Sequence, residues 1–201
     1  MNSKWILLVC LLCVGLVLCL VTMSVAEEQK AAAAAPADDP EKEKLAKESE
    51  EAAAASAKDK PTVDMIVKKV EKACELLGKE GKAAFPKFKG KTSEFIFAGT
   101  YIWVHDMDGI TKMHPIKYKL EGKSTMAIKD VNGKLFFTEM NKIAREKGAG
   151  WLTYMWPKPG EKEPSKKVSY VKMCKVDGVD MVVGCGVYDL PADEVKKLNL
   201  E

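Results

Sequence analysis

Three strand signals follow one another in the last third of the chain, with no helical pattern between them. They cover residues 151–156, 168–175 and 181–188, and each is rich in β-branched, aromatic or aliphatic side chains. The last two are joined by the turn sequence Val176–Val179. Strands that follow each other directly pair antiparallel, whereas a doubly wound sheet needs a helix between its strands. The order therefore predicts an antiparallel sheet.

Two amphipathic helices and earlier strands complete the predicted domain. The first helix begins after Thr62, a residue type that caps helices, and the second covers about 134–147 and stops at Gly148. Apolar residues recur in the first helix at three- and four-residue spacing: Val63, Ile66, Val70, Ala73, Cys74 and Leu77. Further strand signals lie at 94–97, 100–106 and 110–113, and a short polar helix at 191–198. We expect an α+β fold with helices packed on the sheet.

The N-terminus carries an export signal. Lys4 precedes an apolar run from Trp5 to Val21, and Ser24-Val25-Ala26 fits the small-x-small pattern of a cleavage site. We expect a signal peptide over residues 1–26, and an uncleaved membrane anchor is the alternative because the run approaches the length that spans a bilayer. In both cases the remainder is extracytoplasmic or periplasmic, secreted or N-terminally anchored.

The rest of the chain divides by composition. Residues 27–60 are rich in Ala, Glu and Lys, and their only large apolar residue is Leu45, so we expect a solvated low-complexity tether. Residues 61–190 form the predicted domain, and 191–201 a short C-terminal helix or tail. The 32 basic and 29 acidic residues give a formal net charge of +3, too balanced to indicate a nucleic-acid partner.

Three cysteines lie outside the apolar run. Cys174 and Cys185 flank a predicted hairpin and are candidates for a disulfide, but the sequence does not fix their register. All three, Cys74 included, can equally be small buried residues. The pairing therefore stays open.

An aromatic stretch, Gly148–Gly160, lies between the second helix and the next strand. Its strand alternation puts Trp151 on one face and Tyr154 and Trp156 on the other. Rings of this size fill a core or form the wall of a pocket. In the strand at 100–106, the same alternation separates an aliphatic face from an aromatic face with polar tips.

Seven short pieces together resemble the single Cache domains of bacterial extracytoplasmic sensors. They are Thr100–Gly109, His114-Pro115, Gly122–Ser124, Lys129–Gly133, Gly150–Pro157, Ser169–Lys172 and Val183–Tyr188, and the resemblance extends over about 63–189. It implies a PAS-like fold, with a long N-terminal helix on one face of a five-stranded antiparallel sheet and a ligand pocket on the other face. Such domains bind small molecules, often short carboxylates, and pass the bound state to a kinase, chemoreceptor or cyclase. Since only about a dozen residues follow Tyr188, we expect an exported binding protein without its own output module, with a membrane-bound sensor kinase or chemoreceptor as a possible partner.

Eight residues are candidates for the pocket, because a buried carboxylate needs convergent donors and apolar walls. The donors are Tyr101, His114, Tyr154, Tyr170 and Lys172, and the walls are Trp103, Trp151 and Trp156. We hypothesise that their strand faces converge, although strict alternation turns Trp151 away from Tyr154. Each also has a structural explanation: the tryptophans as core, Lys172 as a solvated strand lysine and His114 as the cap of a turn.

Other chemistry finds little support. No nucleophile, base and orienting group occur together, so we predict that the protein is not an enzyme. Asp106, Asp108 and Gly109 fit a hairpin turn better than a calcium loop, and no metal site or cofactor is predicted. Two function classes remain: a binding module for a small organic anion, and a structural or interaction protein that docks to a membrane receptor or kinase without a ligand of its own.

Overall fold

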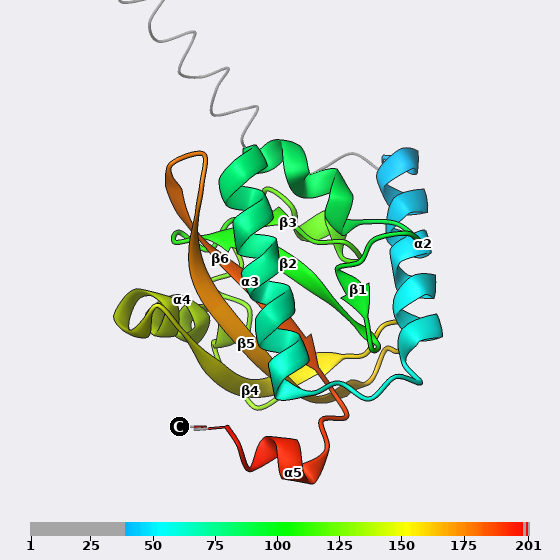
Figure 1. Cartoon of the computed structure of the whole chain (residues 1–201), viewed down its shortest axis with the longest axis vertical. Coiled ribbons are helices and arrows are strands. Elements are labelled where there is room, and N and C mark those ends of the chain that lie inside the picture. The colour runs from blue at the N-terminus through cyan, green and yellow to red at the C-terminus, as the bar shows by residue number, and fades with distance from the viewer. Residues whose placement is uncertain (1–38, 199, 201) are drawn as a thin grey trace, which may run out of the picture. The chain divides into compact units, whose positions relative to one another are not determined.

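The computed structural model describes residues 39–198 and 200. Its centre is an antiparallel sheet in the order β1-β2-β6-β5-β4, and the short β3 also pairs with β2 (Figure 1). The strands are β1 Ile96–Phe97, β2 Thr100–Asp106, β3 Thr111–Met113, β4 Ala149–Pro157, β5 Pro164–Val176 and β6 Val179–Val187. The helices are α2 Pro40–Ser56, α3 Val63–Glu80, η1 Gly81–Phe88, η2 Tyr118–Leu120, α4 Phe136–Lys147 and α5 Ala192–Val195. The predicted α+β architecture is confirmed, and the five-strand path carries the short β3 as an addition.

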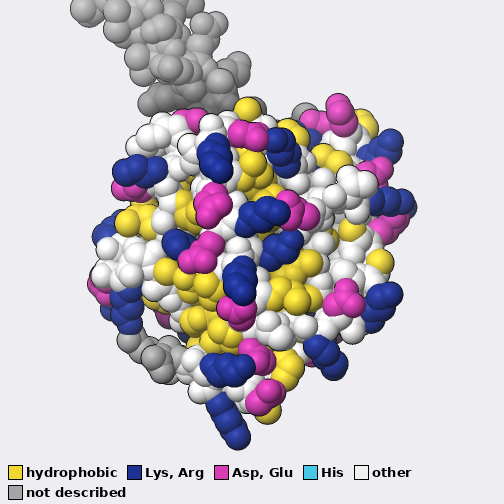
Figure 2. Space-filling model, viewed as in Figure 1, with side chains coloured by type: hydrophobic (Ala, Val, Ile, Leu, Met, Phe, Trp, Pro, Cys, Tyr) yellow, Lys and Arg dark blue, Asp and Glu magenta, His cyan; other side chains and the backbone are white. Residues whose placement is uncertain are grey.

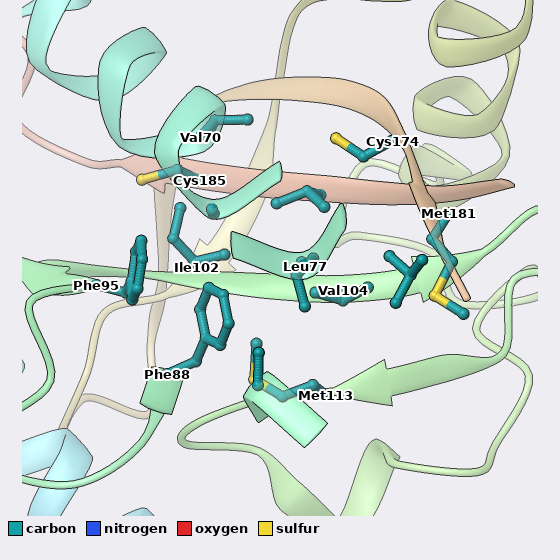
Figure 3. Packing of buried hydrophobic residues seen from close by; sticks show 14 of the residues in the cluster. Val70, Leu77, Phe88, Phe95, Ile102, Val104, Met113, Cys174, Met181 and Cys185 are labelled. Carbon is teal, nitrogen blue, oxygen red and sulfur yellow. The ribbon is translucent and has the colours of Figure 1, made fainter. Parts of the chain in front are cut away.

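Helix α3 covers one face of the sheet. The Thr62 side chain accepts a hydrogen bond from the Met65 amide at 3.2 Å, as expected for an N-cap. The apolar stripe of the helix packs over β5 and β6, and Figure 3 shows Val70 and Leu77 in one cluster with Ile102 and Val104 of β2. The outer surface of this face carries interspersed lysines and acids rather than a patch of one sign (Figure 2).

The opposite face of the sheet packs against α4. Phe136, Phe137 and Met140 of the helix are buried in a second cluster together with Tyr101 and Trp103 of β2. The aliphatic and aromatic faces predicted for β2 are therefore confirmed, because Ile102 and Val104 belong to the α3 side. Alternating side chains thus give the sheet two different surfaces.

Helix α2 corrects the prediction of a solvated tether for residues 40–56, because this part of the predicted tether is a packed helix. The helix packs on β1 and β2, and Ala46, Ser49 and Ala53 are buried. Small side chains let the helix backbone approach closely, so the scarcity of large apolar residues did not prevent packing. Residues 1–38, including the predicted signal peptide, lie outside the described residues. Within the described part, no helix has the length and apolar character needed to cross a bilayer.

The disulfide joins Cys74 of α3 to Cys174 of β5, with the two Cα atoms 5.6 Å apart. The alternative pairing of Cys174 with Cys185 is wrong. In the β5–β6 hairpin, Cys174 lies opposite Met181 and Cys185 lies opposite Tyr170, so the two cysteines are several residue pairs apart. Cys185 is a buried free thiol.

The outer edge of β4 is partly covered by the loop that precedes α4. An Asp130 carboxylate oxygen accepts a hydrogen bond from the Met155 amide at 3.0 Å, and the Lys134 ammonium donates to the Thr153 carbonyl at 2.8 Å. These two contacts satisfy backbone groups that an edge strand otherwise leaves to solvent.

Candidate ligand-binding site

Lys167 lies at the centre of the polar groups on the α4 side of the sheet. It sits on β5 opposite Tyr154, and the residue is only 1% exposed. Its Nζ lies 3.2 Å from the Tyr101 hydroxyl and 4.5 to 5.2 Å from the ring centres of Tyr101, Trp103 and Tyr188. Among the residues that the structure describes, no carboxylate pairs with it. Burial lowers its pKa to about 7, because an ammonium without a counter-ion is costly to bury.

Two glycines of β6 provide the room for this cluster. Gly184 and Gly186 flank Cys185, which points to the α3 side. A Cβ atom at Gly186 would overlap the side chains of Lys167 and Ser169, and one at Gly184 would overlap the indole ring of Trp103. The sequence Gly-Cys-Gly therefore shapes one face for packing under α3 and leaves the other open to large polar side chains.

Tyr154 and Ser169 extend the polar surface along the sheet. The Ser169 hydroxyl donates to the Tyr154 hydroxyl at 3.1 Å, and the Tyr154 ring stacks on Phe136 with centroids 4.3 Å apart. Burial raises the pKa of Tyr154 and of Tyr101 above the ordinary phenol value. Both phenols are therefore neutral at physiological pH and can donate hydrogen bonds.

His114 is held as a neutral imidazole beside Tyr101. Its Nδ1 accepts hydrogen bonds from the amides of Lys117 at 2.8 Å and Ile116 at 3.3 Å, so the ring proton resides on Nε2. Burial, followed by the positive charges of Lys167, Lys117 and Lys89, lowers the His114 pKa well below its usual value. The histidine thus caps its turn, and its ring centre lies 5.0 Å from that of Tyr101.

Two tryptophans complete the enclosure. Trp103 is 3% exposed, and its indole N–H is buried without a hydrogen-bond partner in the described structure. Trp156 packs edge-on against Phe136 and hydrogen-bonds to Tyr101, which offsets part of the effect of burial on the Tyr101 pKa. A buried donor without an acceptor costs free energy, and a bound acceptor would recover it.

The structure does not bring all eight predicted residues together. Tyr101, Trp103, His114, Tyr154 and Trp156 share the Lys167 cluster or its immediate surroundings. Trp151, Tyr170 and Lys172 do not, because strand alternation directs them to the α3 side.

Those three residues have structural partners on the α3 side. Trp151 packs on Tyr170 with ring centroids 5.1 Å apart, and both line a surface groove of about 720 Å³ beside α4. The Lys172 ammonium lies 3.0 Å from a Glu71 carboxylate oxygen of α3. The convergence that we hypothesised for these three residues therefore does not occur.

Sequence reasoning missed Lys167, Ser169 and Tyr188. The predicted strand begins at Val168 and leaves Lys167 out, but β5 begins at Pro164. Alternation along β5 puts Lys167 and Ser169 on the face opposite to Tyr170. Tyr188 closes the predicted strand 181–188, and alternation puts it on the face of Gly184 and Gly186, but it was not chosen as a candidate; in the structure it lies just past the end of β6.

Comparison with known proteins identifies the family. A model of the family described as Single Cache domain 2 matches residues 61–196, more than half of the chain. The chain belongs to this family. Methyl-accepting chemotaxis protein McpP of Pseudomonas putida is 39% identical over 101 residues, which cover 49% of this chain and 18% of that protein. Sensor histidine kinase MctS of Rhizobium johnstonii is 32% identical over 88 residues, which cover 44% of this chain and 18% of that protein.

Solved structures of Cache domains are similar as well. One, described as "Structural basis for carboxylic acid recognition by a Cache chemosensory domain", is 44% identical with a TM-score of 0.42, covering 44% of this chain and 59% of that chain. A periplasmic sensor domain of a chemotaxis protein is 32% identical with a TM-score of 0.48, covering 59% of this chain and 89% of that chain. In sequence, the chain is similar to part of a chemotaxis protein and part of a sensor histidine kinase. The chain spans less than a fifth of the length of the two curated relatives.

Proposed function

We propose that this Cache domain is an extracytoplasmic sensor-type module that binds a small carboxylate and catalyses no reaction. The observation that carries the proposal is Lys167, a buried ammonium with no carboxylate partner among the described residues. A carboxylate beside Lys167 supplies the missing counter-ion. It also lies within reach of the neutral donors Tyr101 and His114 and of the unpartnered Trp103 indole.

The surroundings limit what such a ligand can be. Phe136, Trp156 and the Tyr154 ring border the polar cluster on the α4 side, so the part of the ligand away from the carboxylate meets aromatic surface. Lys167 is the one buried lysine in the described part of the chain. A single buried cation favours a monoanion, because a second carboxylate would remain unpaired.

The relatives support a role in signalling. A related Cache structure is described by its recognition of carboxylic acids, and the curated relatives are a chemotaxis protein and a sensor histidine kinase. We propose that the bound state is read by a membrane-bound chemoreceptor or sensor kinase. Any contact of this protein with the membrane is proposed to use residues 1–26 only, if they are retained.

Short carboxylates should stabilise the protein against heat. We expect acetate, propionate or lactate, at about a hundredfold excess over Kd, to raise Tm by about 5–10 °C, because a ligand that binds only the native state stabilises it. Acetamide and propionamide are matched neutral controls and should leave Tm unchanged. A thermal-shift series in which no carboxylate acts would favour the alternative of a docking protein without a ligand.

Carboxylate affinity should fall as pH rises above 7. With the Lys167 pKa at about 7 in the free protein, the amine is mainly neutral at higher pH, so the ligand must bind together with a proton. We expect Kd to increase about tenfold per pH unit above 7 and to level off below it. Isothermal titration calorimetry in buffers of different ionisation enthalpy measures both Kd and proton uptake.

The lowered pKa of Lys167 makes the ligand-free protein more stable as pH rises, whereas it makes ligand binding weaker. The unfolded chain keeps this lysine proton up to its ordinary pKa of 10.5, so it binds more protons than the folded state between pH 7 and 10.5. The contribution of Lys167 to the free energy of unfolding therefore rises with pH across this window.

A Kd for carboxylates that stays constant from pH 7 to 9 would contradict the assignment of Lys167 as the ligand's partner.

A further inference from the structure

Helix α2 lies outside the part of the chain that matches the family, yet it packs on the ligand-binding side of the sheet. The family match begins at residue 61, whereas α2 ends at Ser56. Figure 1 shows the helix beside β1, and Ala53 is fully buried in the same cluster as Tyr101 and Tyr154. The helix therefore covers one side of the Lys167 site.

Helix α2 is held by a few polar contacts and by small side chains. Glycine amides donate to three of its side chains: Gly90 to Ser49 at 2.8 Å, Gly160 to Glu50 at 2.8 Å and Gly99 to Ser56 at 3.3 Å. Its fully buried side chains are no larger than alanine or serine, so the helix buries little apolar area. By contrast, α3 buries large aliphatic residues and carries the disulfide. Helix α2 is thus attached specifically but weakly.

A hollow lies where α2 meets the β4–β5 turn. Its volume is about 390 Å³, and its lining includes Ala53 and Ala57 from the α2 side, Lys158 and Glu161 from the turn, and Tyr188. The Tyr188 ring centre lies 5.0 Å from the Lys167 Nζ. Tyr188 is therefore a wall shared by the hollow and the ligand site.

We infer that α2 is a movable cover of the binding site. When α2 detaches from the sheet, small organic anions reach Lys167 through the hollow, past Tyr188. The contact between the Glu50 carboxylate and the Gly160 amide acts as the latch, because it joins α2 to the β4–β5 turn. The mouth of the hollow carries Lys158, whose ammonium pairs with the Asp189 carboxylate at 2.8 Å. The inference rests on the proposed function only for the nature of the ligand.

The accessibility of Lys167 measures opening without any carboxylate. Reductive methylation with formaldehyde and cyanoborohydride, followed by peptide mass spectrometry, reports the rate at which each lysine amine is reached. In the full chain we expect Glu50→Ala to raise the Lys167 methylation rate roughly tenfold, since a hydrogen bond to a charged group is lost. Lys172, on the other face, is the internal control and should keep its rate. Glu50→Gln retains the acceptor oxygen and should stay near the wild-type rate.

The outcomes separate the cover from the ligand. An unchanged Lys167 rate in Glu50→Ala, or an equal rise at Lys172, would overturn the cover, because the first shows no gating and the second shows general loosening. Added acetate should protect Lys167 from methylation if the proposed function is right. Faster Lys167 methylation in Glu50→Ala without protection by acetate would support the movable cover and refute the carboxylate ligand. Protection by acetate without faster methylation in Glu50→Ala would support the ligand and refute the cover.

Discussion

Replacement of Lys167 by methionine should weaken the binding of short carboxylates by at least about a hundredfold. The ligand carboxylate would then be buried among aromatic rings with neutral donors but no cation, and removing one partner of a buried ion pair costs about 2–5 kcal/mol. Methionine keeps an unbranched side chain of similar length in the space beside Gly186. The ligand-free variant should be at least as stable as the wild type, because a buried unpaired ammonium is removed.

Lys172→Met is the matched control for this experiment. Lys172 lies on the same strand, but its ammonium pairs with Glu71 on the α3 side at 3.0 Å. The side chains of Lys172 and Glu71 are 34% and 46% exposed. Loss of this ion pair should therefore cost about 0–1 kcal/mol of stability. We expect Kd within about twofold of the wild type. Calorimetry that finds the reverse order, with Lys172→Met defective and Lys167→Met normal, would refute the site.

Removal of the Cys74–Cys174 disulfide should lower the free energy of unfolding by about 4 kcal/mol. The bond joins positions separated by 100 residues, and a cross-link over so long a loop strongly restricts the unfolded chain. It also holds α3 against β5 beside the larger aliphatic cluster. Denaturant titration of Cys74→Ala/Cys174→Ala against the wild type measures the loss.

A reductant provides the second arm of this measurement. The wild type in excess dithiothreitol should match the double variant, because both lack the cross-link. Cys185→Ala should respond to reductant as the wild type does, since Cys185 is a free thiol. Identical unfolding midpoints with and without reductant would show that the bond does not form in the protein.

Much of the fold follows from local sequence patterns. The apolar stripe after Thr62 specifies the buried face of α3, because only one helical face carries large aliphatic residues. Alternation in β2 likewise assigns Tyr101 and Trp103 to one side and Ile102 to the other. Alternation in the same way groups Tyr154 with Trp156, whereas His114 lies in the loop after β3, where alternation does not apply.

The remaining errors have a common physical origin in long-range geometry. Lys167 and Lys172 lie on opposite faces of β5. The pattern of one strand does not say which of its faces will meet α4, and the predicted strand left Lys167 out. The partner of Cys174 depends on the packing of α3 over β5, which no local pattern contains. Packing of α2 depends on the fit of small side chains such as Ala53 against a surface formed elsewhere in the chain.

The hydrogen bonds of Asp130 and Lys134 to the edge of β4 affect whether the protein aggregates at high concentration. A bare strand at the border of a sheet offers its amides and carbonyls to any neighbouring chain, and so invites strand-by-strand stacking into aggregates. Here two charged side chains of the same loop already occupy the Met155 amide and the Thr153 carbonyl. An incoming strand would have to displace both charges, so the border of the sheet is protected against self-association by residues that take no part in recognising a ligand.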